Sequence, residues 1–391
     1  MSSRLYSRNA VLLAKIETTE GTDSSPTGAA NAILCSDLSI EPLAGSSVDL
    51  AYVRPYFGKS PSMRVEDYVT LSMTVDLAGT ATAGNAAPWG PLVRACAMSE
   101  TLLAAAVTGT AQAGTTTQVT LASGASSTDN IYVGADLVIT SGSASGQTRN
   151  IIAYNGTSKV ATVDKAYTAA VGAGGYSISP NATYLPVSSG FESITIYYNN
   201  NGVRHKALGC RGTVSFDLSA NQRPTMKFSF TGMFGGVADA AEASPNYGSW
   251  QVPVPVNSSN SMALIQGKLA DGSATGIQLM SMSLDLGNSV KHRMLVGSEN
   301  VTLTDRQAQG SVSIEATTVA FNDWWTQFRA STKNPLYIEN GTASGNTVGL
   351  FLPNAQLADP KYSDSDGVVM LQASVLAIPS AGNDEVRLIV K

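Results

Sequence analysis

The chain has 391 residues, enough for two or three domains with separate cores. Only 14% of the residues are charged, against roughly 25% in ordinary soluble proteins, so much of the surface must be covered by self-assembly or by uncharged polar side chains. The net charge of −5 argues against general affinity for nucleic acid, which requires clustered Lys and Arg.

The cysteines and the N-terminal residues bear on the cellular compartment. Cys35, Cys96 and Cys210 are odd in number and far apart, which suits a reducing cytoplasm better than a disulfide framework. The apolar run 10–14 ends at Lys15, although a secretory signal needs about 7–15 apolar residues. Because no run approaches the roughly 20 apolar residues of a membrane span, we expect a cytoplasmic protein without one.

Alternation of apolar and polar residues, interrupted by Gly, Asn, Asp and Pro, predicts a mainly β fold. The clearest strands are expected at Val69–Leu77, Ser193–Tyr198, Thr225–Phe230, Ser281–Leu286 and Gly310–Ala316. Two short helices are expected at 87–106 and 321–331. Asn322 should cap the second helix, on which Phe321, Trp324, Trp325 and Phe328 should share one face.

The order of these elements repeats along the chain, which indicates a duplicated domain. Each helix follows a strand, each such strand follows a long polar loop (43–67 and 287–309), and hairpins come after each helix. We expect a first domain from residues 1–106 and 180–245, a proline-rich linker at 246–256 and a second domain at 257–391. Residues 107–179, rich in Ala, Gly, Thr and Ser, should form a small inserted β-module on the outside of the molecule.

The segment HKALGCRGTVSFDL, residues 205–218, contains a histidine and a cysteine near each other. On a regular strand His205 and Cys210 point to opposite faces, and Cys210 shares its face with Leu208 as a small apolar residue would. A catalytic pair must first meet in space, so we expect none here and predict no catalytic residue.

Metal and phosphate motifs are likewise absent from the sequence. No Cys or His cluster has metal-ligand spacing, and His292 is far from His205. Asp364 and Asp366 resemble the start of a calcium loop, but the downstream Glu is missing, so a hairpin turn is the better interpretation. FGKS at 57–60 lacks the upstream glycine of a phosphate loop. We therefore predict neither a metal nor a cofactor.

The segments NAVLLAKIETTEGTDSSPTGAANAI, GVRHKALGCRGTVSFDLSANQRPTMKFSFTGMFG, NAQLADPKYSDSDGVVMLQASVLA and AGNDEVRLIVK resemble tail tube (major tail) proteins of long, non-contractile-tailed bacteriophages. The module VGADLVITSGSASGQTRNIIAYNGTSKVATVD is similar to small β-domains of phage structural proteins. The resemblance implies β-sandwich tube domains, each flanked by a short helix. One departure is that the usual tube protein has a single tube domain, and this chain is expected to have two.

The resemblance also implies rings that stack into a tube. If each tube domain supplies about four strands to the lumen, six domains supply about 24, which leaves an aqueous channel. Two domains per chain then predict a ring of three chains with pseudo-sixfold symmetry.

Position within the family assigns the long loops to ring stacking. The residues expected to dock on the next ring are Tyr52, Arg54, Tyr56, Phe57 and Arg64 in the first loop and Lys291, His292, Arg293 and Met294 in the second. Thr213, Ser215 and Asp217 are candidates for a polar, acidic lumen that DNA passes without specific binding.

The partners implied are further copies of the chain, a tape-measure protein inside the tube, and terminator and tip proteins at its ends. The location implied is the virion tail, assembled in the host cytoplasm. The sequence leaves two other functions open: a β-sandwich adhesin or receptor-binding protein, and a hydrolase using His205 or Asp364 and Asp366.

Overall fold

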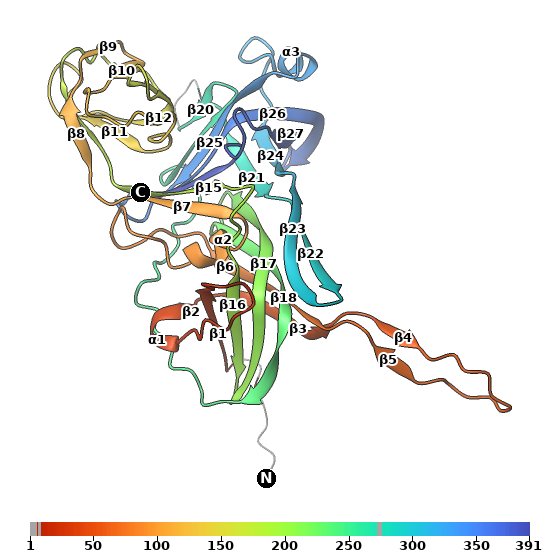
Figure 1. Ribbon diagram of the computed structural model, residues 1–391. Coiled ribbons are helices and arrows are strands. Elements are labelled where there is room, and N and C mark those ends of the chain that lie inside the picture. The colour runs from red at the N-terminus through yellow and green to blue at the C-terminus, as the bar shows by residue number, and fades with distance from the viewer. Residues whose placement is uncertain (1–5, 7–8, 272–275) are drawn as a thin grey trace.

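The computed structural model describes residue 6 and residues 9–271 and 276–391. It is mainly β, as the alternation predicts, and its described helices are short: α1 (Gly28–Asn31), α2 (Gly90–Arg94) and α3 (Trp324–Arg329). All five strands predicted above are present, four of them within two residues of the expected bounds, while the strand expected at Thr225–Phe230 continues to Asp239. The strands form two large sheets and two separate hairpins (Figure 1).

The first series of elements spans most of residues 10–239. Its strands are β1 (Ala10–Ile16), β2 (Ala32–Ile33), β3 (Ser36–Ala44), β4 (Ser47–Asp49), β5 (Ser62–Arg64), β6 (Tyr68–Asp76), β16 (Ile194–Asn200), β17 (Val203–Ser219) and β18 (Thr225–Asp239). The antiparallel pairing runs in the order β1–β16–β17–β18–β6–β3, and β2 also pairs with β1.

The second series spans residues 261–377 and has the same order. Its strands are β19 (Ser261–Ile265), β20 (Lys268–Ala270), β21 (Leu279–Asp285), β22 (Asn288–Leu295), β23 (Ser298–Arg306), β24 (Gln309–Glu315), β25 (Lys333–Asn340), β26 (Val348–Ser365) and β27 (Val368–Ala377). Pairing runs β19–β25–β26–β27–β24–β21, with β20 on β19. Each strand of this series therefore has a counterpart in the first.

Two buried tryptophans occupy matching positions in the two series. Trp89 Nε1 donates to the carbonyl of Ala78, two residues after β6 ends, at 2.8 Å. Trp324 Nε1 donates to Thr317 Oγ1, two residues after β24 ends, also at 2.8 Å. Both indoles are almost fully buried, and a buried indole N–H requires such a partner. This match aligns the end of β6 with the end of β24.

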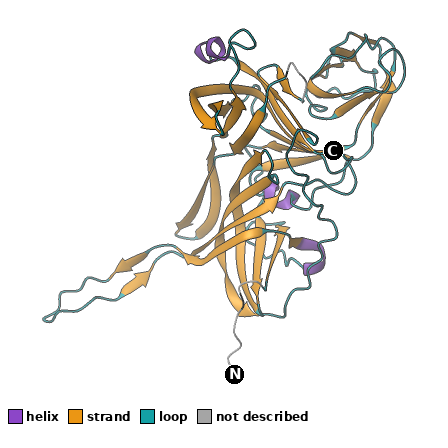
Figure 2. Ribbon diagram, turned by 180° about the vertical axis from the view of Figure 1, so that it is seen from behind, coloured by secondary structure: helices purple, strands orange, loops and turns teal. Residues whose placement is uncertain are grey.

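The remaining strands attach a separate unit to the second series. The seven-stranded sheet, ordered β8-β14-β11-β12-β13-β10-β9, comprises β8 (Val107–Thr110), β9 (Ala113–Gly114), β10 (Gln118–Thr120), β11 (Asp136–Ile139), β12 (Thr148–Asn155), β13 (Val160–Val163) and β14 (Gly175–Ile178). Flanking strands β7 (Met98–Leu103) and β15 (Asn181–Pro186) pair together, and β15 continues through β28 (Arg387–Val390) to β26. Figure 2 shows this unit at one end of the molecule.

The unit shares its apolar core with the second series. Its buried residues pack against Leu264, Tyr337, Phe351 and Ile389. Gly134, at φ +85°, lies so close to Ile389 that a Cβ there would collide with the isoleucine side chain. The chain leaves the first series after α2, builds this unit on the second series, and returns to the first at β16.

Both predicted helices are shorter than expected. The expected helix 87–106 ends at Arg94, because residues 98–103 gain more hydrogen bonds as β7 beside β15 than a short helix offers. In α3 the cap is Asp323 instead of Asn322: its carboxylate accepts from the Thr326 backbone N–H at 3.0 Å, the spacing that an N-cap requires. The expected aromatic face is only partly buried, since Trp325 is 38% exposed.

Candidate assembly interface

His205 and Cys210 lie on β17 in different surroundings. Register shifts in β17 interrupt the regular alternation on both of its sides, but the two residues still do not form a catalytic pair. Cys210 is completely buried, and burial raises the pKa of its thiol well above the ordinary value. His205 packs against Tyr198 with ring centroids 5.8 Å apart, burial lowers the pKa of its imidazole, and its Nδ1 has no hydrogen-bond partner among the described residues.

Alkylation kinetics should reflect this burial. Burial raises the pKa of Cys35 to about 11, so little thiolate exists at neutral pH. In the native protein, reaction of Cys35 with iodoacetamide should be slow and rise about tenfold per pH unit towards that value. Cys96 and Cys210, both fully buried, should react only after unfolding. Mass spectrometry measures the rates, with urea-unfolded chain as the control; fast native labelling of Cys210 would contradict the structure.

The two aspartates near the C-terminal hairpin form a turn. Asp364 Oδ1 accepts from the Gly367 backbone N–H at 3.3 Å, and Asp366 adopts a positive φ of 52° at the hairpin tip. The described residues contain no group of three His, Cys, Asp or Glu side chains that could hold a metal ion. Within the same residues no helix is long and apolar enough to cross a membrane.

Eight neighbouring strands form one continuous antiparallel sheet across both series. Their order is β3–β6–β18–β17–β21–β24–β27–β26, and the two series meet where β17 pairs with β21. We call this β17–β21 pairing the internal joint. One face packs on the core, where Phe216, Phe228 and Phe230 are at most 1% exposed.

The opposite face of this sheet is polar. Thr213, Ser215 and Asp217 lie on it, and register places Asp285, Ser283 and Ser311 beside them. The charged side chains of its strands are Glu41, Asp76, Asp217, Asp285 and Glu315 against Lys227 and Lys361. Arg223, in the turn before β18, pairs with Asp76 at 3.0 Å. Five carboxylates against three cations leave this face acidic.

The two outermost strands each have a free edge among the described residues. β3 pairs only with β6, and residues 357–365 of β26 pair only with β27. The corresponding stretch of β17 instead pairs on its second side with β21 in the internal joint. Long unpaired edges are templates for pairing with another chain, so β3 and β26 are candidate assembly surfaces.

Between β3 and β6 a long hairpin, residues 45–67, extends away from the rest of the molecule (Figure 1). We call it the first arm. It carries exposed apolar side chains near its tip: Tyr52 is 62% exposed, Tyr56 66%, and Val53 and Phe57 completely exposed. Arg54 in the same tip is also exposed, and Arg64 at the root pairs with Asp67 at 2.5 Å.

The second arm, residues 287–307, contains β22 and β23 and lies along β17 and β18 in Figure 1. Its Val301 is completely buried, and Arg211 of β17 donates to the Val301 carbonyl. Lys291 and Arg293 are both exposed, and Met294 near the tip is 44% exposed. Both arms begin at a positive-φ glycine, Gly45 or Gly287, at which a Cβ would collide with the carbonyl of the returning strand.

His292 joins the second arm to the root of the first. Its Nδ1 lies 2.9 Å from Glu66 Oε1, its Nε2 lies 3.0 Å from Glu299 Oε1, and its ring packs on Tyr68 with centroids 5.0 Å apart. The side chain is only 3% exposed. These contacts within the chain occupy His292, so its expected docking on another ring stays a prediction, as do the docking roles of the other loop residues.

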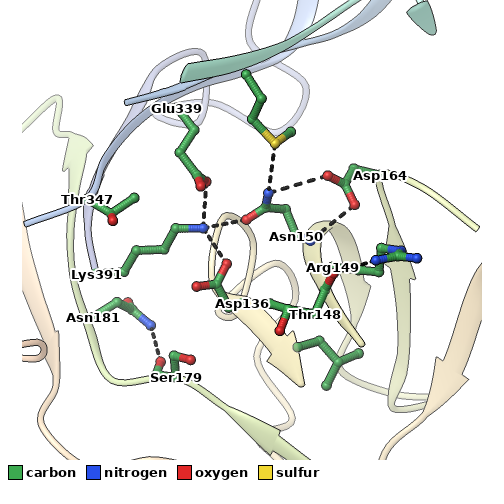
Figure 3. Close-up of polar contacts among 12 residues, drawn as sticks. Asp136, Thr148, Arg149, Asn150, Asp164, Ser179, Asn181, Glu339, Thr347 and Lys391 are labelled. Carbon is green, nitrogen blue, oxygen red and sulfur yellow. Dashed lines mark hydrogen bonds and ion pairs between the residues drawn. The ribbon is translucent and has the colours of Figure 1, made fainter. Parts of the chain in front are cut away.

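A buried ion cluster holds the seven-stranded unit against the second series (Figure 3). Lys391 Nζ lies 2.5 Å from Asp136 Oδ1 and 2.6 Å from Glu339 Oε2, and it also donates to Asn150. Burial alone would lower the pKa of Lys391, but the two carboxylates outweigh it and raise that pKa above the ordinary lysine value. No local pattern in the sequence indicates this cluster, because its members are scattered over more than 250 positions.

A sequence model described as phage tail tube protein matches residues 7–377, nearly the whole chain. The chain belongs to the phage tail tube protein family. This tail tube protein is therefore a structural component of the virion tail that self-assembles into a tube, and it is not an enzyme. The hydrolase alternative is wrong. No curated protein matches the sequence.

Proposed function

We propose that three chains close into a ring with pseudo-sixfold symmetry and that the rings stack into the tube of a long, non-contractile tail. The two series of strands would be two tandem tube domains, residues 1–106 with 180–245 and residues 257–391, joined by the linker 246–256. The module 107–179 would lie outside. The matching strand orders of the two series support this division.

The observation that carries the proposal is the eight-stranded sheet with one free edge at each end. Three such sheets joined edge to edge supply about 24 strands, enough to surround an aqueous channel, and closure leaves no free edge. Six whole chains would supply about 48 strands and a much wider bore.

The acidic polar face would line the channel, with Thr213, Ser215 and Asp217 among its residues. An acidic lining repels the phosphates of DNA, so the genome would move through the tube into the host without being held. The tips of both arms would contact the next ring through Tyr52, Tyr56, Phe57 and Met294, since exposed aromatic and Met side chains are typical of interfaces.

The remaining partners rest on the family resemblance. A tape-measure protein would occupy the channel during assembly in the host cytoplasm, and terminator and tip proteins would close the two ends. The adhesin alternative predicts a discrete oligomer that never polymerises.

Negative-stain microscopy and ring mass test the proposal. Purified chain should form tubes, and ring averages should show six similar lobes with the mass of three chains. Native mass spectrometry of disassembled tubes provides an independent count. Six whole chains per ring would contradict the trimer, and a discrete oligomer under all conditions would contradict the tube.

A further inference from the structure

We propose that the contact between neighbouring chains in the ring has the same strand register as the internal joint, position by position. The inference rests on the proposed ring and specifies its interface. The free edge of β26 would receive β3 of a second copy of this chain, in one register, and the first arm of that copy would cross the second tube domain.

The two series can be aligned at single-residue level from their own contacts. The tryptophan hydrogen bonds match Asp76 of β6 with Glu315 of β24. Strand pairing extends this match across each sheet. In the first series Asp76 pairs with Thr225, which pairs in turn with Asp217. In the second series Glu315 pairs with Met370, which pairs in turn with Ser363. Asp217 of the first series therefore corresponds to Ser363 of the second.

The other partner of the joint is matched in the same way. Ser72 lies four residues before Asp76 and pairs with Ser39. Ser311 lies four residues before Glu315 and pairs with Ser283. Ser39 therefore corresponds to Ser283.

The internal joint pairs Asp217 with Ser283 and Ser215 with Asp285. Copied to the free edges, it pairs Ser363 with Ser39 of the second copy and Lys361 with Glu41 of the second copy. Asp285 of β21 corresponds to Glu41 of β3, so this position stays acidic. Ser215, which lies opposite Asp285, corresponds to Lys361. The copied joint thus gains an opposite-charge pair, which stabilises neighbouring strands.

Burial within the chain supports the same contact. In the internal joint Phe216, Leu284 and Met282 are at most 1% exposed. The corresponding residues at the free edges, in the same order, are Tyr362, Ile40 and Leu38. Tyr362 is 61% exposed, and the other two are only half-buried. A second copy would supply the missing cover at all three positions.

The first arm would then have a surface to lie on. The second arm follows β21 and packs on β17 and β18, the strands next to the internal joint, where it contacts the first arm's root through His292 and Glu66. The first arm follows β3 in the same way and has about the same length between Gly45 and Glu66. On the neighbour it would cover β26 and β27 and reach the second arm's root at Gln307.

Disulfide mapping tests the register. In a Cys35→Ser background, Ser39→Cys with Ser363→Cys places two thiols directly opposite, at a separation that a disulfide spans. Oxidised tubes should run as covalently linked trimers. The pair Ser39→Cys with Ser365→Cys, slipped by two residues, should link at least about tenfold less. Asp217→Cys with Ser283→Cys, inside one chain, is the positive control for the geometry.

A charge swap tests the same register without cysteines. Lys361→Glu sets two carboxylates opposite each other and should lower the tube yield, and adding Glu41→Lys should restore it. Failure to restore, or equal linking of the slipped pair, would overturn the proposed register. A Ser39→Cys, Ser363→Cys variant that forms rings but does not link would refute the copied joint and leave the ring proposal standing. Wild-type chains that never form rings would refute both.

Discussion

A chain whose first-arm residues 50–61 are replaced by Asn-Gly is expected to fold and still to form rings, held by the β3–β26 contact and the remaining root of the arm, but no longer to form tubes. Asp49 and Ser62 are paired across the hairpin, so a two-residue turn can join them without disturbing the arm's root. The replacement removes Tyr52, Val53, Tyr56 and Phe57, each of which is at least 62% exposed. Their loss should therefore change the free energy of unfolding by less than about 0.5 kcal/mol.

The effect on stacking should be large because it is multiplied around the ring. Burying one such aromatic side chain contributes about 1.5–3 kcal/mol, and each ring would present several of them to the next ring. Negative-stain microscopy and sedimentation separate rings from tubes. Lys59→Ser, a polar change in the same tip, is the matched control and should stack normally. Normal tubes from the shortened arm would contradict its role in stacking.

Lys391→Met should destabilise the attachment of the module by up to about 3 kcal/mol, because it leaves the partly buried carboxylates of Asp136 and Glu339 without their cation. The change should appear as a lower urea midpoint for the transition in which the module separates from the second series. Limited proteolysis at 104–110 and 179–181 across a urea series reports that transition. An unchanged midpoint would show that the cluster contributes nothing.

The triple variant Lys391→Met, Asp136→Asn, Glu339→Gln is the matched control. It removes all three charges, so it should recover most of the lost stability.

The stability of the attachment should also depend on pH through the ionisation of Lys391. The pKa of Lys391 is raised on folding, so its contribution is complete below the unfolded value of about 10.4 and is lost as pH rises through the folded pKa. The contribution of Lys391 to the attachment should therefore be flat from pH 7 to about 10 and fall at higher pH.

Some of the fold follows from local sequence. Period-two alternation locates β6, β18, β21 and β24, because each of these strands has one buried and one polar face. It also locates β16, although that strand is buried on both faces. Cys210 is recognisable as a core residue because it accompanies Leu208, although the register shift between Leu208 and Arg211 interrupts the alternation there. The polar face with Thr213, Ser215 and Asp217 is visible from the alternation.

Other elements depend on partners that are distant along the chain. Residues 98–103 have helix-forming neighbours but become β7, because β15, about 80 positions later, pairs with them. The Lys391 cluster draws on residues 136, 150 and 339, and no local pattern announces it. The sequence predicts a polar loop at 43–67. The hairpin form of this loop depends on pairing between Ser47–Asp49 and Ser62–Arg64.

By itself the sequence determined the β class, the duplicated order of elements and the family resemblance, since these are written in local periodicity and in repeated order. Only the tertiary structure decided that the internal joint fills one sheet edge and leaves two others open, and that the module packs on the second series instead of the first. The physical reason is that a strand edge needs backbone hydrogen-bond partners and a buried charge needs an opposite charge, and segments distant along the chain supply both. That choice depends on the whole arrangement in space.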